Sequence, residues 1–202
     1  MVVTNPSQSV LDLFTETGAY LRGHFRLTSG LHSGEYLQCA KVLRFPVHAE
    51  SLGRSLAEGL SSLAAGPIDV VVSPAMGGII IGHEAARALS VPFLFTERDP
   101  GSGKMVLRRG FTLDTGQTAV VVEDVITTGG STREVIELLA QAGVRVLAAG
   151  SIIDRSGGDA DVGVARVALA TLHPETWNPE GCPLCAQGVA IQKPGSRVVP
   201  TA

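Results

Sequence analysis

The stretch that most constrains the fold runs from residue 117 to residue 141 and reads QTAVVVEDVITTGGSTREVIELLAQ. Its apolar run, Ala119 to Val122, is typical of a buried strand. Two carboxylates, Glu123 and Asp124, follow directly, and then comes a loop of threonine, glycine and serine. Apolar residues recur at helical spacing in the segment 135–139. The predicted order is therefore strand, acidic pair, short loop, helix.

The loop between the acids and the helix has the chemistry of a phosphate site. We expect the helix to begin near Ser131, where its first N–H groups lack partners and, with the helix dipole, favour an anion. Gly129 and Gly130 allow the backbone to approach a ligand closely, and four hydroxyl groups surround the same point. The hydroxyl side chains are those of Thr127, Thr128, Ser131 and Thr132.

Two well-known phosphate loops do not match these residues. No lysine follows the glycines, as a Walker loop requires, and the spacing is not that of a dinucleotide-binding turn. Carboxylates beside a phosphate suit the vicinal hydroxyls of a ribose, or a hydrated Mg²⁺ held through those hydroxyls. The stretch therefore predicts a site for a ribose 5-phosphate. The alternative is an ordinary surface turn in which the acids have no role.

Residues 121–131, VVEDVITTGGS, closely resemble the phosphoribosyl pyrophosphate (PRPP) binding motif of the type I phosphoribosyltransferases. This resemblance implies that Glu123, Asp124 and the loop from Thr127 to Thr132 bind PRPP. It implies Mg²⁺ as the cofactor, carried by PRPP with no direct protein ligand. Glu123 and Asp124 would be catalytic, because they would hold the ribose hydroxyls while positive charge develops on the sugar.

A second strand, glycine loop and helix lies upstream. Residues 68–72 are apolar and lead into the loop SPAMGG, after which helical spacing resumes; an amphipathic helix is predicted over 48–63. Two such units predict an α/β fold with a doubly wound, mainly parallel sheet flanked by helices, and ligands outside the carboxyl ends of the strands. The resemblance implies that Gly77 and Gly78 bind the pyrophosphate. The alternative is that both glycines serve only tight packing.

The segment HFRLTSGLHSGEYLQ, residues 24–38, predicts short strands joined by a loop. Beside the PRPP motif, it resembles the N-terminal hood of orotate phosphoribosyltransferases, which carries the pattern F-x-L-x-S-G. This resemblance implies that orotate is the acceptor. The residues implied to bind it here are Ser29, Gly30, Tyr36 and Thr127. Two lysines common in that family are absent, because Thr28 and Gly77 stand in their places.

Four cations gather around a loop of proline, glycine and serine between residues 97 and 110. Loops of that composition are mobile and can close over a ligand. In the family a flexible loop here supplies lysine and arginine to the leaving pyrophosphate, often from a neighbouring subunit. The resemblance therefore implies that role for Arg98 and Lys104, although the family's K-x-x-K-x-H pattern is absent. For Arg108 and Arg109 we expect at least one solvated ion pair with an acid.

An arginine follows another predicted strand, residues 145–153, in the sequence DRSGG. Arg155 would lie on the ligand side of the sheet, where its planar fork can pair with a carboxylate. Orotate is a carboxylate, and family members share this Asp-Arg step, so the resemblance implies that Arg155 binds orotate. The alternative is a structural ion pair with Asp154 or Asp159. A final strand is expected near the sheet edge at 164–172.

The length of 202 residues predicts one domain, 1–202, with a hood of about residues 1–45 plus the C-terminal segment and a core of about 46–172. The net charge of −3 argues against a nucleic-acid partner. No segment has the apolar length of a membrane span or the pattern of a signal peptide, so we expect a cytoplasmic protein. A homodimer is implied only by the resemblance.

Three cysteines make a disulfide framework an unfavourable interpretation. Cys182 and Cys185 form a C-x-x-C with His173 nine residues earlier, and Cys39 is remote in sequence. Because this count gives only three ligands, we expect an ordered turn with reduced thiols rather than a zinc site. The remaining histidines show no catalytic pairing and are expected to be structural or at a rim. They are His24, His32, His48 and His83.

The sequence as a whole predicts transfer of a phosphoribosyl group from PRPP to orotate, giving orotidine 5′-monophosphate and pyrophosphate. Two alternatives keep the same PRPP motif. One is a phosphoribosyltransferase for another base, which would have no use for Arg155. The other is a non-catalytic PRPP-binding regulator of the same fold, which the missing lysine at Gly77 leaves open.

Overall fold

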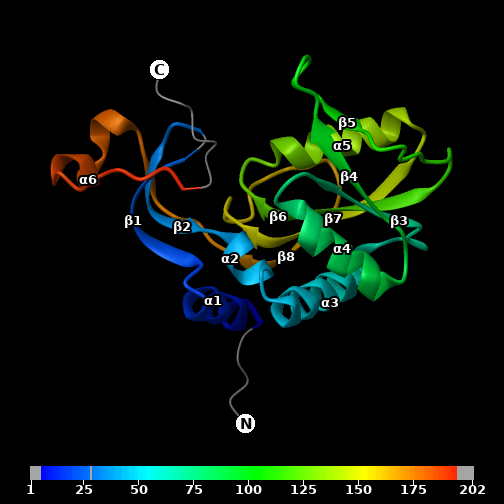
Figure 1. The fold of residues 1–202 in the computed structure, drawn as a ribbon, viewed down its shortest axis with the longest axis horizontal. Coiled ribbons are helices and arrows are strands. Elements are labelled where there is room, and N and C mark those ends of the chain that lie inside the picture. Colours follow the sequence, from blue (N-terminus) through cyan, green and yellow to red (C-terminus); the bar gives the residue numbers. More distant parts are fainter. Residues whose placement is uncertain (1–5, 28, 195–202) are drawn as a thin grey trace, which may run out of the picture.

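A six-stranded sheet forms the centre of the computed structural model, which describes residues 6–27 and 29–194 (Figure 1). The strand order is β5-β4-β3-β6-β7-β8, and all neighbouring pairs are parallel except β4 and β5. The strands are β3 (Val70–Pro74), β4 (Phe93–Arg98), β5 (Met105–Leu107), β6 (Thr118–Ile126), β7 (Arg145–Asp154) and β8 (Arg166–Thr171). The predicted fold class is confirmed, including the position of the 164–172 segment at an edge.

Helices cover both faces of this sheet. The helices are α1 (Pro6–Glu16), α2 (Cys39–Leu43), α3 (Pro46–Leu63), α4 (Gly78–Leu89) and α5 (Gly130–Gln141). One apolar core joins α1 to α4 to one face, through side chains such as Val71, Val120 and Ile152. A second core joins α5 to the other face, through Val72 and Val121. Successive residues of a strand point to opposite faces, so these continuous valine runs serve both cores.

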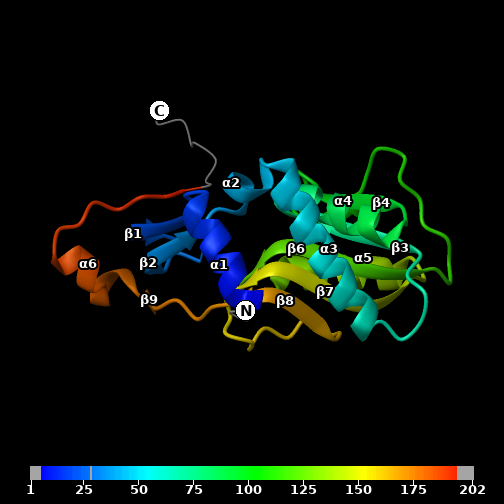
Figure 2. The ribbon, with the colours of Figure 1, turned by 90° about the horizontal axis from the view of Figure 1, so that it is seen from below.

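A separate three-stranded antiparallel sheet stands beside the carboxyl ends of the central strands (Figures 1 and 2). Its order is β1-β2-β9, so it combines the start of the chain with a C-terminal strand. The strands are β1 (Tyr20–Arg26), β2 (His32–Leu37) and β9 (Thr176–Trp177). We call this sheet, with the C-terminal segment that follows it, the hood. That segment contains a 3₁₀ turn (Pro179–Gly181) and α6 (Pro183–Ala186).

The C-terminal segment returns to β1 after α6. The amide of Gln192 donates to the carbonyl of His24 at 2.7 Å, and the amide of Arg26 donates to the carbonyl of Gln192 at 2.8 Å. The hood therefore depends on contacts between the two ends of the described chain. Within the described ranges, no helix combines the length and apolar character that a bilayer crossing requires.

Candidate functional site

A cavity of about 750 Å³ lies between the hood and the carboxyl ends of β6 and β7. The hood contributes Ser29, Tyr36 and Trp177, while the core contributes Asp124 and Arg155. The remaining lining residues are Leu27, Leu31, Leu37, Gln38, Val125, Thr127, Thr128, His173, Pro174, Glu175 and Thr176. A cavity of this size can enclose a small ring compound together with part of a second ligand.

A smaller cavity of about 170 Å³ lies at the start of α5. Its lining is the loop predicted to bind phosphate, preceded by part of the strand end. These residues are Glu123, Val125, Ile126, Thr127, Thr128, Gly129, Gly130, Ser131 and Thr132. The helix begins at Gly130, one residue before the predicted start, and its first intrahelical bond runs from the Arg133 amide to the Gly129 carbonyl at 2.9 Å. The N–H groups before Arg133 are therefore available to an anion.

The two cavities are neighbours, because Val125, Thr127 and Thr128 line both. The acidic pair lies where they meet: Asp124 lines the large cavity and Glu123 lines the small one. A ligand with a phosphate in the small cavity can therefore extend past two carboxylates into the large cavity. This is the arrangement that a ribose 5-phosphate requires.

The two carboxylates have different surroundings. Glu123 is 9% exposed, and this burial raises the pKa of its carboxyl group well above the ordinary range, an effect to which the negative charge of Asp124 adds. Asp124 is more accessible, and its Oδ1 accepts a hydrogen bond from the Val125 amide at 2.9 Å. Asp124 thus faces the large cavity, while the buried Glu123 lines the small one.

The start of α4 lies against the acidic pair. A Cβ atom at Gly77 would lie 2.5 Å from Oδ1 of Asp124, and one at Gly78 would lie 3.0 Å from the carbonyl of Val122. The structure therefore brings both glycines to the acids, as the pyrophosphate prediction requires. A side chain at Gly77 would require the Asp124 carboxylate to move from this position.

Arg155 follows β7 directly and lines the large cavity. Burial lowers the pKa of its guanidinium group, although the nearby Tyr36 and Glu35 oppose this effect. Its buried Nε finds no hydrogen-bond acceptor among the described residues. Unpaired buried donors are costly, so a ligand acceptor in the cavity is the expected partner.

The preceding residue, Asp154, fixes the turn that carries Arg155. Its Oδ2 accepts from Arg166 Nη1 at 2.6 Å, and its Oδ1 accepts from Ser156 N at 2.8 Å and Ser156 Oγ at 2.6 Å. Burial acts to raise the pKa of Asp154, but the bonds from Ser156 and Arg166 outweigh it and lower the pKa. The ion pair that was the alternative role for Arg155 is thus made by Arg166 instead.

A phosphoribosyl transferase domain model matches residues 48–168. The orotate phosphoribosyltransferase of Desulforamulus reducens is 50% identical over 192 residues, covering 95% of this chain and 98% of that protein. That of Thermotoga petrophila is 48% identical, covering 93% of this chain and 98% of that protein. The chain belongs to the orotate phosphoribosyltransferases.

Solved structures agree with this family assignment. The crystal structure of orotate phosphoribosyltransferase from Aeropyrum pernix has 30% sequence identity and a TM-score of 0.66, covering 81% of this chain and 93% of that one. An adenine phosphoribosyltransferase at 18% identity and a TM-score of 0.64 shares the fold. Phosphoribosyltransferases for orotate and for adenine therefore share this fold. The fold alone does not identify the base, which depends on the residues of the cavity.

The cationic segment connects β4 to β5. It is a tight hairpin between β4 and β5, in which the Asp99 amide donates to the Lys104 carbonyl at 2.9 Å and the Gly103 amide to the Asp99 carbonyl at 2.8 Å. These backbone hydrogen bonds describe one conformation of the segment, and its expected mobility stays a prediction. Asp99, Gly101 and Gly103 lie in the turn between the two strands, where residues of these types are favoured.

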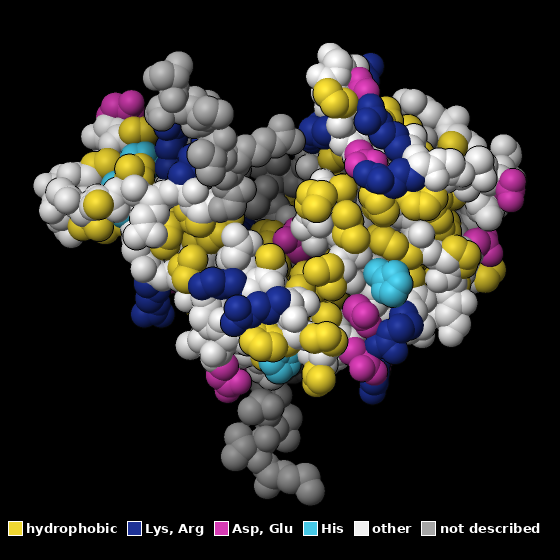
Figure 3. Space-filling view, in the orientation of Figure 1, with side chains coloured by type: hydrophobic (Ala, Val, Ile, Leu, Met, Phe, Trp, Pro, Cys, Tyr) yellow, Lys and Arg dark blue, Asp and Glu magenta, His cyan; other side chains and the backbone are white. Residues whose placement is uncertain are grey.

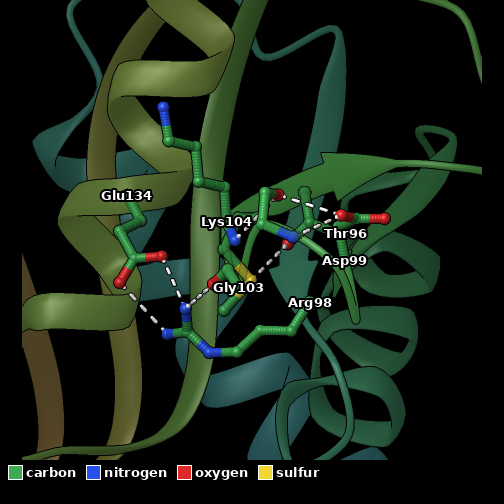
Figure 4. Close-up of polar contacts among 8 residues, drawn as sticks. Thr96, Arg98, Asp99, Gly103, Lys104 and Glu134 are labelled. Atoms are coloured by element: carbon green, nitrogen blue, oxygen red, sulfur yellow. Dashed lines mark hydrogen bonds and ion pairs between the residues drawn. The ribbon is translucent and has the colours of Figure 1, made fainter.

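The cations of this hairpin are mostly paired. Arg98 forks onto Glu134 of α5, with N···O distances of 2.9 and 3.1 Å, and also donates to the Gly103 carbonyl at 2.7 Å (Figure 4). The Lys104 side chain points away from that pair in Figure 4, and no partner is found for its ammonium within the described ranges. Both arginines for which solvated ion pairs were expected have them: Arg108 pairs with Asp99 at 2.6 Å and Arg109 with Glu97 at 2.9 Å.

The hood residues fall partly inside the large cavity. Ser29 and Tyr36 line it, and burial raises the pKa of the Tyr36 hydroxyl. Gly30 lies beside Ser29 with φ +89° and is not among the lining residues. Thr28 lies outside the described residues. Sequence reasoning missed the wall formed by residues 173–177, although the chain's single tryptophan, in a proline-rich segment, could have marked it.

Proposed function

We propose that this chain transfers the 5-phosphoribosyl group of PRPP to orotate, giving orotidine 5′-monophosphate and pyrophosphate, a step of pyrimidine biosynthesis. The observation that carries the proposal is the Arg155 guanidinium, whose Nε has no acceptor among the described residues and which lines a cavity that also contains Asp124. A carboxylate-bearing base supplies the missing acceptor. A purine or uracil offers only neutral acceptors, with no carboxylate to pair with the guanidinium group.

The chain's own residues would divide the work as follows. The loop from Thr127 to Thr132 and the start of α5 grip the 5-phosphate, with N–H and hydroxyl donors. Glu123 and Asp124 hold the ribose hydroxyls and stabilise the positive charge that develops at the anomeric carbon as the pyrophosphate leaves. Arg155, Ser29, Gly30, Tyr36 and Thr127 orient the base for attack. Positioning and electrostatics thus provide the catalysis.

Mg²⁺ fits this site through its ligand preference. The paired carboxylates are hard oxygen donors beside the place where the ribose hydroxyls would lie, which suits a hydrated Mg²⁺ carried by PRPP. When bound, the ion neutralises charge on the pyrophosphate. We propose no direct protein ligand for it.

Gly77 and Gly78, with Arg98 and Lys104, would hold the leaving pyrophosphate. Lys104 supports this role because its ammonium has no partner in the part of the chain that the structure describes. Arg98 would have to exchange Glu134 for a phosphate oxygen. Both residues of that pair are about half exposed, at 44% and 40%, so the exchange costs little.

The proposed assembly is a homodimer of single-domain chains in the cytoplasm, each with a hood of about residues 1–45 plus the C-terminal segment and a core of about 46–172. Support for a dimer comes from exposed apolar side chains at the starts of α3 and α4, namely Phe45, Val47, Met76 and Ile80. Three free thiols support a reducing compartment. We propose no nucleic-acid or membrane partner.

Pyrophosphate release from PRPP, measured with a panel of orotate, uracil, adenine and hypoxanthine, tests the function. Among these bases, only orotate is expected to cause pyrophosphate release from PRPP. Release with another base, and not with orotate, would contradict the proposal, and PRPP binding without release on any base would favour a regulator. Asp124→Asn should lower turnover by about 10²-fold or more while the far-UV circular dichroism stays unchanged.

A further inference from the structure

Two histidines of the hood and the two cysteines of the C-terminal segment converge on one point. His24 and His32 come from β1 and β2, while Cys182 and Cys185 flank the start of α6. One ligand atom from each side chain lies within 4.8 Å of every other. Spacing along the sequence suggested three possible ligands, His173 and the two cysteines. The fold instead brings His24 and His32 to the cysteines, which makes four.

The distances in this cluster match those around a tetrahedral metal. The His24 Nε2 to His32 Nδ1 distance is 3.0 Å, Cys185 Sγ lies 3.3 Å from His32 Nδ1 and 3.7 Å from His24 Nε2, and Cys182 Sγ lies 3.5 Å from His24 Nε2. Zinc with Zn–N of 2.0–2.1 Å and Zn–S of 2.3 Å would set these separations at about 3.3 Å for N···N and about 3.5 Å for N···S. These four separations agree with the zinc values to within a few tenths of an ångström, and all four ligand atoms lie within 4.8 Å of one another.

A hydrogen bond on the side away from the cluster fixes the orientation of the His24 ring. Its Nδ1 is 2.8 Å from the carbonyl oxygen of Val189, which can only accept, so Nδ1 carries the proton and donates. Nε2 then presents its lone pair to the cluster. A backbone carbonyl on the far nitrogen is the usual support of a metal-binding histidine.

Burial distinguishes this cluster from a chance surface grouping. His24, His32 and Cys182 are 1%, 6% and 3% exposed. Both cysteines are free thiols, so neither forms a disulfide that would prevent metal binding. Cys185 is exposed and closes the cluster from the solvent side. The two imidazoles and the Cys182 thiol, which are buried, have few other ways to satisfy their polar atoms.

We propose that His24, His32, Cys182 and Cys185 bind one Zn²⁺ as a closed structural site. Two thiolates and two imidazoles form a complete tetrahedral set, which leaves no position for substrate or water. The ion would join β1 and β2 to the C-terminal segment. Because His32 pairs with Trp177 in the β2–β9 ladder, the ion would also stabilise the hood wall of the large cavity. The proposal stands whichever base the enzyme uses.

Metal content is the direct test. The full chain, expressed without a histidine tag and purified without chelator, should contain about one zinc per chain by plasma mass spectrometry. Cys185→Ser should reduce this ratio to near zero, as should His32→Ala. Two matched variants outside the cluster, Cys39→Ala and His83→Ala, should keep the full ratio. Zinc-free native protein that also fails to take up added Zn²⁺ would overturn the proposal.

The wild-type chain provides a test that does not depend on folded variants. Cobalt(II) exchanged into the protein should give the thiolate charge-transfer and tetrahedral ligand-field bands of a two-sulfur site. Chelation should lower the unfolding temperature, and added Zn²⁺, but not Mg²⁺, should restore it. A cobalt spectrum without sulfur bands, or a Cys182–Cys185 disulfide in the purified native protein, would contradict the site.

Discussion

Arg155 shows how a single residue sets the choice of base. Its charge lies at the end of β7, its Nε has no acceptor among the described residues, and its turn is held by Asp154 rather than by its own ion pair. A guanidinium kept free in this way is suited to a ligand carboxylate, which it can bind through two parallel hydrogen bonds.

Replacing Arg155 by alanine should therefore weaken the binding of orotate more than the binding of PRPP. Hydrogen bonds to charged groups contribute about 1.5–3 kcal/mol, so kcat/KM for orotate should fall by roughly 10- to 150-fold. Arg155→Lys should keep only part of the wild-type kcat/KM for orotate, because a lysine lacks the planar guanidinium group. Steady-state kinetics with each substrate varied measures this effect. Arg145→Ala, at the opposite end of the same strand, is the matched control, and an equal loss for both substrates would contradict the assignment.

Glu123 makes a pH-dependent contribution to stability. Its folded pKa lies above the ordinary value of 4.5, so the folded state binds the proton more tightly than the unfolded state. Its stabilising contribution is complete below the unfolded pKa and is lost as pH rises through the folded pKa. Each tenfold difference in proton affinity between the two states corresponds to about 1.4 kcal/mol of stability.

Glu123→Gln removes this titration, so the free energy of unfolding of the variant should fall less than that of the wild type as pH rises above the ordinary glutamate pKa of 4.5. Urea unfolding at several pH values measures the difference. Glu180→Gln, at an exposed position of the C-terminal segment, controls for the loss of one carboxylate. Parallel profiles for wild type and Glu123→Gln would show that burial does not act on this group.

Among elements, the loop before α5 depends on one glycine conformation. Gly129 has φ +76°, and a Cβ there would lie 2.7 Å from Cγ1 of the buried Val162. Gly129→Ala should lower the free energy of unfolding by at least about 1–2 kcal/mol, the cost of the left-handed conformation, and should weaken PRPP binding because the phosphate loop moves. Denaturant unfolding and PRPP titration measure these two losses.

Gly130 provides the comparison for that experiment. Its φ is not positive, and the nearest atom to an added Cβ is Thr128 Oγ1 at 3.6 Å. Gly130→Ala should therefore leave stability unchanged or raise it by about 0.4–1 kcal/mol. Equal destabilisation by both substitutions would mean that neither φ nor Val162 explains the need for glycine.

The difference between local and long-range signals decides how much the sequence could predict. The strand, acids, loop and helix from Thr118 to Gln141 were predictable because their chemistry lies within consecutive residues, and the same holds for Arg155 after β7. The pairing of Arg98 with Glu134 could not be predicted, because it crosses from a hairpin to a helix. The His24 and Cys182 cluster was missed for the same reason, since only the assembled hood brings its members together.

At the scale of the whole molecule, the sheet places two glycine loops at the carboxyl ends of neighbouring strands. β3 and β6 are adjacent and parallel, so the loops that follow them, with Gly77 and Gly129, open at the same edge. The hood, which stands beside this edge in Figure 1, contributes one wall of the large cavity. One end of the molecule thus holds the substrates, which leaves the helical face free for assembly.

That helical face carries an apolar surface. Hydrophobic side chains gather over α2, α3 and α4 in Figure 3, and the exposed ones include Val47 at 74% and Met76 at 81%. Large exposed apolar side chains in a group mark a protein interface. Because Met76 precedes Gly77, a partner bound here would also lie close to the pyrophosphate loop.

We therefore expect a dimer through this face. Light scattering after gel filtration should give twice the mass of one chain, and Ile80→Asp should give a monomer, because a buried unpaired charge costs several kcal/mol at an interface. Leu63→Asp is the matched control: Leu63 is 39% exposed, lies about 24 Å along α3 from Val47, and is on the part of that helix that runs away from α4 (Figure 2). A dimer that survives Ile80→Asp but not Leu63→Asp would move the interface to the other end of α3. If the Ile80→Asp monomer also loses turnover while its PRPP affinity holds, the partner contributes to pyrophosphate departure rather than to binding of the ribose phosphate.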